Sequence, residues 1–300
     1  MQKVMDCFSR MWLALVYGAR FWPMGLRNAV AHVASFILWY VVPIRRRVVR
    51  TNLRLCFPEK TEAERRAIAR ECIFWAARAM IDHGTLWRGS PEDIRKLVTL
   101  SPEFLKVFND ESQRPLLMIS AHCCGLDATG QAMTLLRPII CLYLTQRSAV
   151  WDEAIVKGRD RFHRPIMIRK TADGTGHDIL QIVRAMKKGN PFYYFPDMDY
   201  GRRNAEFIDF FGVPAATITT ASRLAKVSGA KVIFCFSEMT KSGYYLHATD
   251  IWKGFPTDDP VADTERITRE IEKWIRRFPS QYMWMHRRFK TRPEGEESFY

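Results

Sequence analysis

Short apolar segments alternate with helix-forming segments through the middle of the chain, and this alternation limits the folds that the chain can adopt. Five apolar segments have strand length: Leu116–Ser120 and residues 139–144, 166–168, 192–195 and 232–236. Helical patterns occupy residues 126–136, 150–161, 176–188 and 217–228. Strands that alternate with helices predict an α/β fold with a mostly parallel central sheet flanked by helices.

Two further helices are indicated on either side of this region. Thr61 and Glu64 form a capping box that opens a long run with apolar residues at helical spacing. Residues 263–277 form an amphipathic pattern that ends before Pro279. No internal repeat or low-complexity linker divides the chain. We therefore expect one catalytic domain over residues 46–300, preceded by a hydrophobic segment over residues 1–45.

The N-terminal segment has two apolar runs, at residues 11–19 and 29–42. The second has 14 residues, fewer than the ~20 that a spanning helix needs. We interpret the pair as a retained hydrophobic hairpin or as helices lying in the membrane interface; the alternative is an ordinary buried core helix. Aromatic residues suited to headgroup depth are Trp12, Trp22, Trp39 and Tyr40. Arg45, Arg46 and Arg47 follow the second run and predict that the rest of the chain lies on the cytoplasmic side.

The composition points to a folded basic protein. The chain has 46 Lys and Arg against 32 acidic residues, a formal net charge of +14, which favours anionic partners. Nine Trp, 19 Phe and 47% hydrophobic residues exclude a disordered basic tail. Charge alone leaves nucleic acid, an anionic membrane and an acidic protein open. Seven scattered cysteines without CxxC pairs indicate a reducing compartment and no zinc site.

One possible catalytic pair follows the first apolar strand. His122 comes directly after it, and Asp127 lies five positions later. The two side chains can meet only if His122 is in the strand-end loop and Asp127 in the first helical turn. Asp127 could then orient the imidazole, leaving its other nitrogen as a base. Cys123 and Cys124 allow a rival hypothesis, a Cys-His thioesterase or hydrolase, although small buried cysteines are commoner.

A second polar cluster follows the strand at residues 192–195. It contains Asp197 and Asp199, then Gly201 for a tight turn and Arg202. Arginines beside a strand-end carboxylate suit phosphate recognition, and a solvated turn with ion pairs is the alternative. The Asp-x-Asp pair has no third ligand, so we assign no metal. Gly212 and Pro214 are expected to introduce the helix at residues 217–228.

Two other arginines lie at element ends. Arg159 lies near the end of a predicted helix, and Arg169 follows the short strand at residues 166–168. Each could be a surface cation or could contact an anionic substrate.

Several stretches resemble the lauroyl/myristoyl acyltransferases of lipid A biosynthesis, within the wider lysophospholipid acyltransferase-like superfamily. These stretches are RTNLRLCFPEKTEAER, SAHCCGLD, YYFPDMDYGRRNAEFIDFFGVPAATITTASRLA and QYMWMHRRFKTRPEGEESFY. The resemblance implies an inner-membrane enzyme that faces the cytoplasm. It further implies that the enzyme takes an acyl group from an acyl carrier protein thioester, without another cofactor, and esterifies a hydroxyacyl chain of a lipid A precursor.

The resemblance also assigns site residues. His122 and Asp127 fall on the family's catalytic H-x4-D/E dyad. Asp197, Asp199, Gly201 and Arg202 fall on the family's aspartate-glycine block, and Arg169 falls near an arginine block that related acyltransferases use for a phosphate. With Arg159, chosen from its place at a helix end, these are the expected substrate-binding residues. The expected partners are acyl carrier protein, the glycolipid and the inner membrane, with no nucleic acid. Two rival functions are an acyltransferase for another glycolipid or a lysophospholipid, and a basic nucleic-acid-binding protein.

Overall fold

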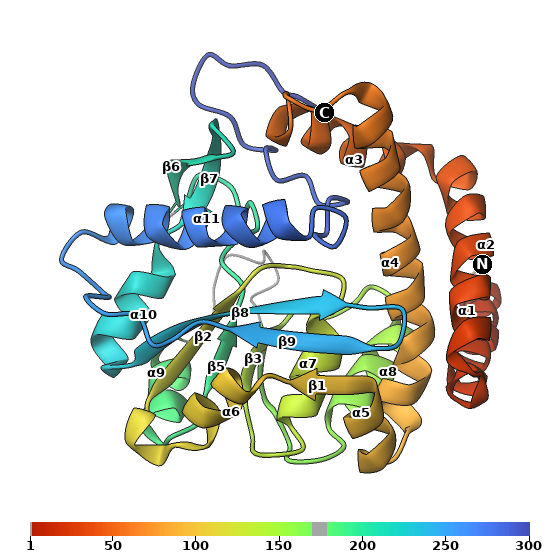
Figure 1. Cartoon of the computed structure of the whole chain (residues 1–300), viewed down its shortest axis with the longest axis horizontal. Helices are drawn as coiled ribbons and strands as arrows, with labels where there is room; N and C mark the ends of the chain where they lie inside the picture. Colours follow the sequence, from red (N-terminus) through yellow and green to blue (C-terminus); the bar gives the residue numbers. More distant parts are fainter. Residues whose placement is uncertain (1, 170–178, 204) are drawn as a thin grey trace.

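A seven-stranded sheet forms the centre of the computed structural model, which describes residues 2–169, 179–203 and 205–300 (Figure 1). In spatial order the strands are β1 (Val98–Leu100), β9 (Tyr244–Ala248), β8 (Lys231–Met239), β2 (Leu116–Ser120), β5 (Phe192–Tyr194), β3 (Ile140–Tyr143) and β4 (Ile166–Arg169). The last five are parallel, whereas β9 is antiparallel to β8 and parallel to β1. All five strands expected from the sequence are present, and the prediction of a mostly parallel sheet is confirmed.

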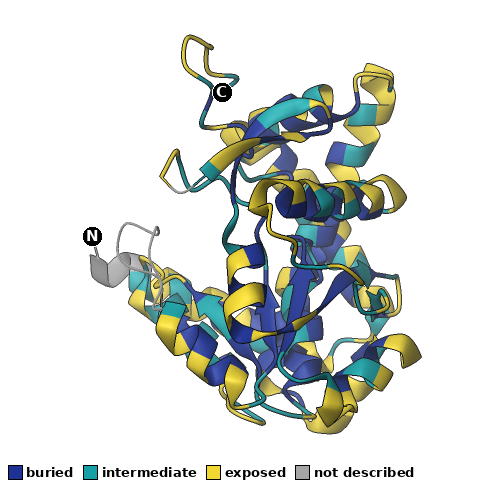
Figure 2. Cartoon of the chain, turned by 90° about the vertical axis from the view of Figure 1, so that its left-hand side faces the viewer, coloured by how far each residue is buried: buried dark blue, intermediate teal, exposed yellow. Residues whose placement is uncertain are grey.

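Helices cover both faces of the sheet. Because successive side chains of a strand point to opposite faces, one strand contributes to two core clusters. In β2, Leu117 and Ile119 join one core cluster, and Leu116 and Met118 join another. The first cluster includes side chains from α9 (Ile179–Lys187), α10 (Thr220–Ser228) and α11 (Pro260–Arg277); the second includes side chains from α6 (Pro102–Asn109) and α7 (Leu126–Met133). Figure 2 shows the buried strands between helices with exposed outer sides.

The structure corrects the expected start of the helix at residues 217–228. Val213–Ile218 is a strand, β7, which pairs antiparallel with β6 (Ala205–Phe210). Phe211 and Gly212 have φ of 54° and 76° and close the turn, so Gly212 makes a hairpin instead of opening a helix. α10 begins at Thr220. Residues 176–178 of another predicted helix lie outside the described residues.

The N-terminal part forms helices packed beside the sheet. α1 (Gln2–Gly18), α2 (Met24–Val41) and α3 (Pro43–Cys56) precede α4 (Glu62–Arg88), whose expected capping box is present. The remaining elements are η1 (Ala19–Phe21), α5 (Pro91–Leu97), η2 (Glu111–Gln113) and α8 (Ala149–Arg159). α1 lies directly on α4, where a Cβ on Gly84 would be 2.0 Å from the carbonyl oxygen of Val16. Gly84 therefore permits this close helix contact.

Among the described helices, none is by itself long and apolar enough to cross a bilayer. α2 and α3 together, with a 94° bend between them, meet that requirement by length and composition. The expected boundary between residues 45 and 46 falls inside α3, and the division into two parts stays a prediction.

Candidate active site

His122 and Asp197 meet at the carboxyl edge of the sheet. His122 follows β2 and Asp197 follows β5, and these two strands are neighbours in the sheet. The ring Nδ1 of His122 lies 2.6 Å from Oδ1 of Asp197, and the His122 main-chain N–H donates to Oδ2 at 2.8 Å. This carboxylate therefore fixes both the backbone and the ring of His122.

The contact defines which nitrogen of His122 is available. The Asp197 side chain is only 1% exposed, whereas that of His122 is 21% exposed. Burial raises the pKa of the Asp197 carboxyl, but the charge of His122 and its hydrogen bonds outweigh burial, and the pKa is lowered overall. The Asp197 carboxylate can only accept a hydrogen bond, so it favours a proton on Nδ1, and in the neutral ring the lone pair is then on Nε2. That arrangement suits a general base.

Asp127 lies in the first turn of α7, as expected, but it contacts His83 and Arg159. Nε2 of His83 lies 3.2 Å from Oδ2 of Asp127, and Arg159 Nη2 lies 2.5 Å from Oδ1. In this conformation Asp197 therefore occupies the place beside His122 Nδ1 that the sequence suggested for Asp127. The expected catalytic role of Asp127 stays a prediction.

The Asp127 cluster is strongly polar. Burial raises the pKa of the Asp127 carboxyl, but the charge of Arg159 and the hydrogen bond from His83 lower it well below its usual range. Nδ1 of His83 faces the carbonyl oxygen of Ala79 at 2.8 Å. Both His83 nitrogens thus face oxygen acceptors. Arg159 and His83 therefore hold the two oxygens of the Asp127 carboxylate in the wall of the cavity that His122 also lines.

A cavity of about 750 Å³ joins these groups. His122, Asp127 and Arg159 contribute to its wall, and the rest is mainly apolar, including Leu142, Tyr193 and Phe195. The wall also contains the residues at the two ends of β3, Ile139 and Leu144. A strand rise of ~3.3 Å per residue places these two residues about 16 Å apart. The cavity thus extends from the polar groups at the carboxyl edge along the face of the sheet.

Three expected substrate-binding residues belong to a hydrogen-bond network that reaches the C-terminal segment. Asp199 accepts hydrogen bonds from the N–H and hydroxyl of Thr291, at 2.7 and 2.8 Å, and from the N–H of Gly201 at 2.9 Å. Gly201 has φ of 91°, which favours glycine. Arg202 donates to the carbonyl oxygen of Arg292 at 2.7 Å. Asp199 also lines the cavity, so it alone of these three is placed to touch a ligand there.

Arg169 ends β4, opposite Tyr143 of β3, at the same edge of the sheet as His122. Its side chain lies outside what the structure describes, and its expected contact with substrate stays a prediction.

The cysteines beside His122 are poorly suited to act as nucleophiles. Burial raises the pKa of the Cys123 thiol to about 12. A hydrogen bond with Cys72 and burial raise the pKa of Cys124 well above its ordinary value. Because the thiolate is the reactive form, the structure argues against the thioesterase hypothesis.

Two site residues were missed by sequence reasoning, His83 and His286. The ring centroid of His286 is 5.9 Å from that of His122, and both rings line the cavity. Burial and the neighbouring His122 lower the pKa of His286 to about 4. The positions of His83 in α4 and of His286 near the C-terminus give no local signal of either contact.

Comparison with known proteins places this site in a family context. Residues 8–291 match the family described as bacterial lipid A biosynthesis acyltransferase. The chain is 31% identical to the lipid A biosynthesis palmitoleoyltransferase and lauroyltransferase of Escherichia coli (strain K12), in both cases over 85% of this chain and 82% of the relative. It is also 31% identical to the myristoyltransferase of that organism, over 84% and 77%.

Among solved structures, the chain is similar to the 1-acyl-sn-glycerophosphate acyltransferase of Thermotoga maritima, with a TM-score of 0.40 and 10% identity over 87% of this chain and 99% of that chain. This likeness is too distant to support a conclusion.

Proposed function

This chain belongs to the bacterial lipid A biosynthesis acyltransferase family, and on that basis we propose that it transfers a fatty acyl group from an acyl carrier protein thioester to a hydroxyl of a lipid A precursor. The acceptor hydroxyl is that of a hydroxyacyl chain. One observation carries the proposal: Asp197 holds Nδ1 of His122, and His122 lies in the wall of a mainly apolar cavity.

His122 is the general base of the proposed reaction. Nε2 takes the proton of the acceptor hydroxyl, whose oxygen attacks the thioester carbonyl carbon and forms a tetrahedral intermediate. The C–S bond then breaks, and the protonated His122 returns the proton to the leaving thiolate. α7 begins four residues after His122, and the N–H groups at a helix start favour the negative charge of the oxyanion. No covalent acyl-enzyme is required.

The apolar cavity is assigned to the acyl chain of the donor. Leu142, Tyr193 and Phe195 provide apolar surface next to His122, and the wall continues to Ile139 at the far end of β3. A fatty acyl chain that lies along this wall would place its thioester near the polar groups at the carboxyl edge. Burial of the chain supplies binding energy roughly in proportion to its apolar area.

Asp127 and Arg159 are assigned to substrate positioning. Asp127 is 30% exposed and Arg159 is 24% exposed, so both are accessible from the cavity. Arg159 has five N–H donors, more than its contact with Asp127 uses. The remaining donors suit an oxygen of the donor or a phosphate of the glycolipid.

The N-terminal helices are assigned to the membrane interface, on the cytoplasmic face of the inner membrane. Of the 20 large apolar side chains exposed in the described residues, 13 lie in the first 44 positions. They are Phe8, Met11, Trp12, Leu15, Phe21, Leu26, Val33, Phe36, Ile37, Leu38, Tyr40, Val41 and Ile44. Such a concentration on a few helices is typical of a surface that contacts lipid.

One of the basic residues after α2 lies close to the active site. Arg45 donates a hydrogen bond to the carbonyl oxygen of Met285 at 3.1 Å, beside His286 in the cavity wall. A cation there suits the phosphates of the glycolipid and the acidic acyl carrier protein. The same contact would hold the active site close to the membrane surface.

A comparison of donors and acceptors in an acyl-transfer assay tests the proposal. The detergent-solubilised protein would receive an acyl carrier protein thioester, or the coenzyme A thioester of the same acid, with a tetra-acyl lipid A precursor or a lysophospholipid as acceptor. We expect a product heavier by one acyl chain, formed faster from the carrier protein donor. Transfer to a lysophospholipid but not to the glycolipid would replace the proposed acceptor, and a preference for coenzyme A would replace the proposed donor.

A further inference from the structure

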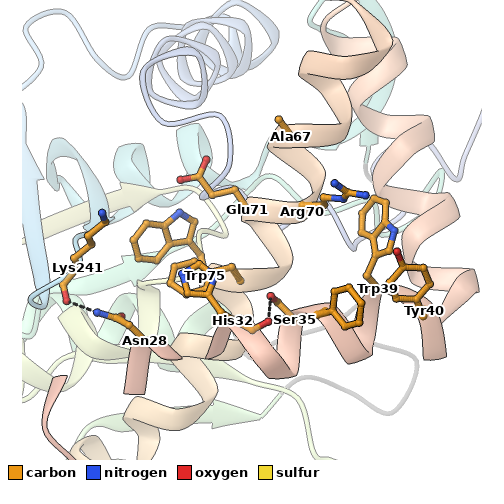
Figure 3. A pocket seen from close by; sticks show the side chains of 12 residues that line it. Asn28, His32, Ser35, Trp39, Tyr40, Ala67, Arg70, Glu71, Trp75 and Lys241 are labelled. Atoms are coloured by element: carbon orange, nitrogen blue, oxygen red, sulfur yellow. Dashed lines mark hydrogen bonds between the residues drawn. The ribbon is translucent and has the colours of Figure 1, made fainter. Parts of the chain in front are cut away.

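A second cavity, of about 730 Å³, lies between α2 and α4 (Figure 3). We call it the α2–α4 groove. Side chains of both helices line it, together with Lys241 of the turn between β8 and β9. The main-chain oxygen of Lys241 accepts a hydrogen bond from Asn28 of α2 at 3.0 Å, which joins that turn to the groove. None of its lining residues contributes to the active-site cavity.

An unsatisfied donor lies in the wall of this groove. Trp75 is only 7% exposed, and its indole Nε1–H has no hydrogen-bond partner among the described residues. Figure 3 shows the indole in the middle of the groove, with its nitrogen on the side of Glu71. A buried N–H without an acceptor is destabilising. A ligand oxygen bound in the groove beside this indole would satisfy the donor.

Charged groups flank this indole. Figure 3 shows Lys241 on one side of Trp75 and Glu71 on the other. The ion pairs found in the described residues include neither Lys241 nor Glu71. The wall of the groove thus contains an ammonium, an N–H donor and a carboxylate, which complement a ligand that carries both an oxyanion and a cation.

The other end of the groove is aromatic. Trp39, Tyr40 and Phe36 line it, and the guanidinium of Arg70 lies 5.5 Å from the Trp39 ring centroid. Phe36 and Tyr40 are 66% and 56% exposed and continue into the exposed apolar surface of α2. A hydrocarbon chain could therefore pass from the groove into the surrounding lipid without crossing a polar rim.

We propose that the α2–α4 groove binds a membrane glycerophospholipid whose headgroup carries a phosphodiester and a primary amine. The phosphate accepts from the Trp75 indole and pairs with Lys241, and the amine pairs with Glu71. An acyl chain lies along Phe36 and Tyr40. The groove is a lipid-binding site outside the catalytic cavity, and it would attach the enzyme to the bilayer through α2 and α4.

Equilibrium binding to the full-length protein in detergent micelles tests the site. The probes are dioleoylphosphatidylethanolamine, dioleoylphosphatidylglycerol and inorganic phosphate. We expect Trp75→Phe and Lys241→Gln each to weaken binding of phosphatidylethanolamine by about tenfold, because each removes a bond to the phosphate. Matched controls are Trp252→Phe and Lys96→Gln, which lie outside both cavities and should bind as the wild type does.

The amine is tested by Glu71→Gln. This variant should lose affinity for phosphatidylethanolamine and not for phosphatidylglycerol, so the ratio of the two Kd values should change by about tenfold. An unchanged ratio would overturn the amine assignment. Equal binding by the wild type, Trp75→Phe and Lys241→Gln would overturn the site, as would full competition by inorganic phosphate.

The test is separate from the catalytic proposal. His122→Ala should bind phosphatidylethanolamine as the wild type does, whether or not it transfers acyl groups. Displacement of bound phospholipid by the lipid A precursor, together with a higher KM for that precursor in Lys241→Gln, would assign the groove to the acceptor and contradict the phospholipid site.

Discussion

Asp197 binds His122 through both the ring Nδ1, at 2.6 Å, and the main-chain N–H, at 2.8 Å. The two residues are 75 positions apart in the sequence, and the pairing of β2 with β5 brings them together. Ile119 and Tyr194 face each other across these strands, so the segments that follow leave the sheet side by side. The orientation of the proposed base is therefore set by the sheet.

Replacing Asp197 by Asn should lower kcat by about 100- to 10,000-fold with little change in KM. An amide cannot accept hydrogen bonds at both of its polar atoms, so His122 loses its fixed ring orientation. Steady-state kinetics of acyl transfer would measure the effect. Asp199→Asn is the matched control; a loss as large in that variant would show that the C-terminal segment, and not the His122 contact, is responsible.

Replacing Asp127 by Asn should act mainly on substrate binding. Arg159 and His83 would lose their carboxylate partner, and we expect KM for a substrate to rise by about tenfold while kcat falls less than in Asp197→Asn. The split between kcat and KM separates the two carboxylates. A kcat loss equal to that of His122→Ala with unchanged KM would restore Asp127 as the partner of His122.

His286 should make the protein less stable in mild acid. Its folded pKa of about 4 is below its unfolded value of 6.5, so the unfolded chain binds more protons between these values. The contribution of His286 to the free energy of unfolding therefore increases with pH across this window, and it is lost as the pH falls towards 4. His286→Gln should reduce the fall in Tm between pH 7 and pH 5. An equal fall in the variant and the wild type would contradict the lowered pKa.

Asp82 should be essential for stability. Its side chain is fully buried and bonds Arg27 of α2 at 3.0 Å and the hydroxyl of Tyr244 of β9 at 2.8 Å. Asp82→Asn should cost about 3 to 5 kcal/mol, because it leaves two buried cations, Arg27 and Arg78, without their counter-charge. Thermal unfolding would show the loss. The exposed pair Lys226–Asp258 is the control: Asp258→Asn should leave the unfolding transition close to that of the wild type, because exposed ion pairs contribute little to stability.

The elements of the parallel sheet could be predicted because each has its own local signal. Leu116–Ser120 is apolar throughout, since both faces of β2 are buried. The hairpin β6–β7 was missed because Pro214 and Gly212 suggested a helix start, whereas pairing with Ala205–Phe210 holds Val213–Ile218 extended. Strand pairing of this kind overrides local propensity.

The candidate site was predicted in location but not in all of its contacts. His122 could be placed at the carboxyl end of a strand from the sequence alone. Its contact with Asp197, and those of Asp127 with His83 and Arg159, depend on which strands are neighbours and on how α4 packs against α7. Spacing along the chain carries no information on such distant pairs.

The most direct test of His122 as the base of acyl transfer is the product formed by the wild type and His122→Ala from one acyl carrier protein thioester and one lipid A precursor. Mass spectrometry should show one added acyl chain with the wild type and a rate about 100- to 10,000-fold lower with the folded variant. Near-normal product formation by His122→Ala would contradict the assignment of His122.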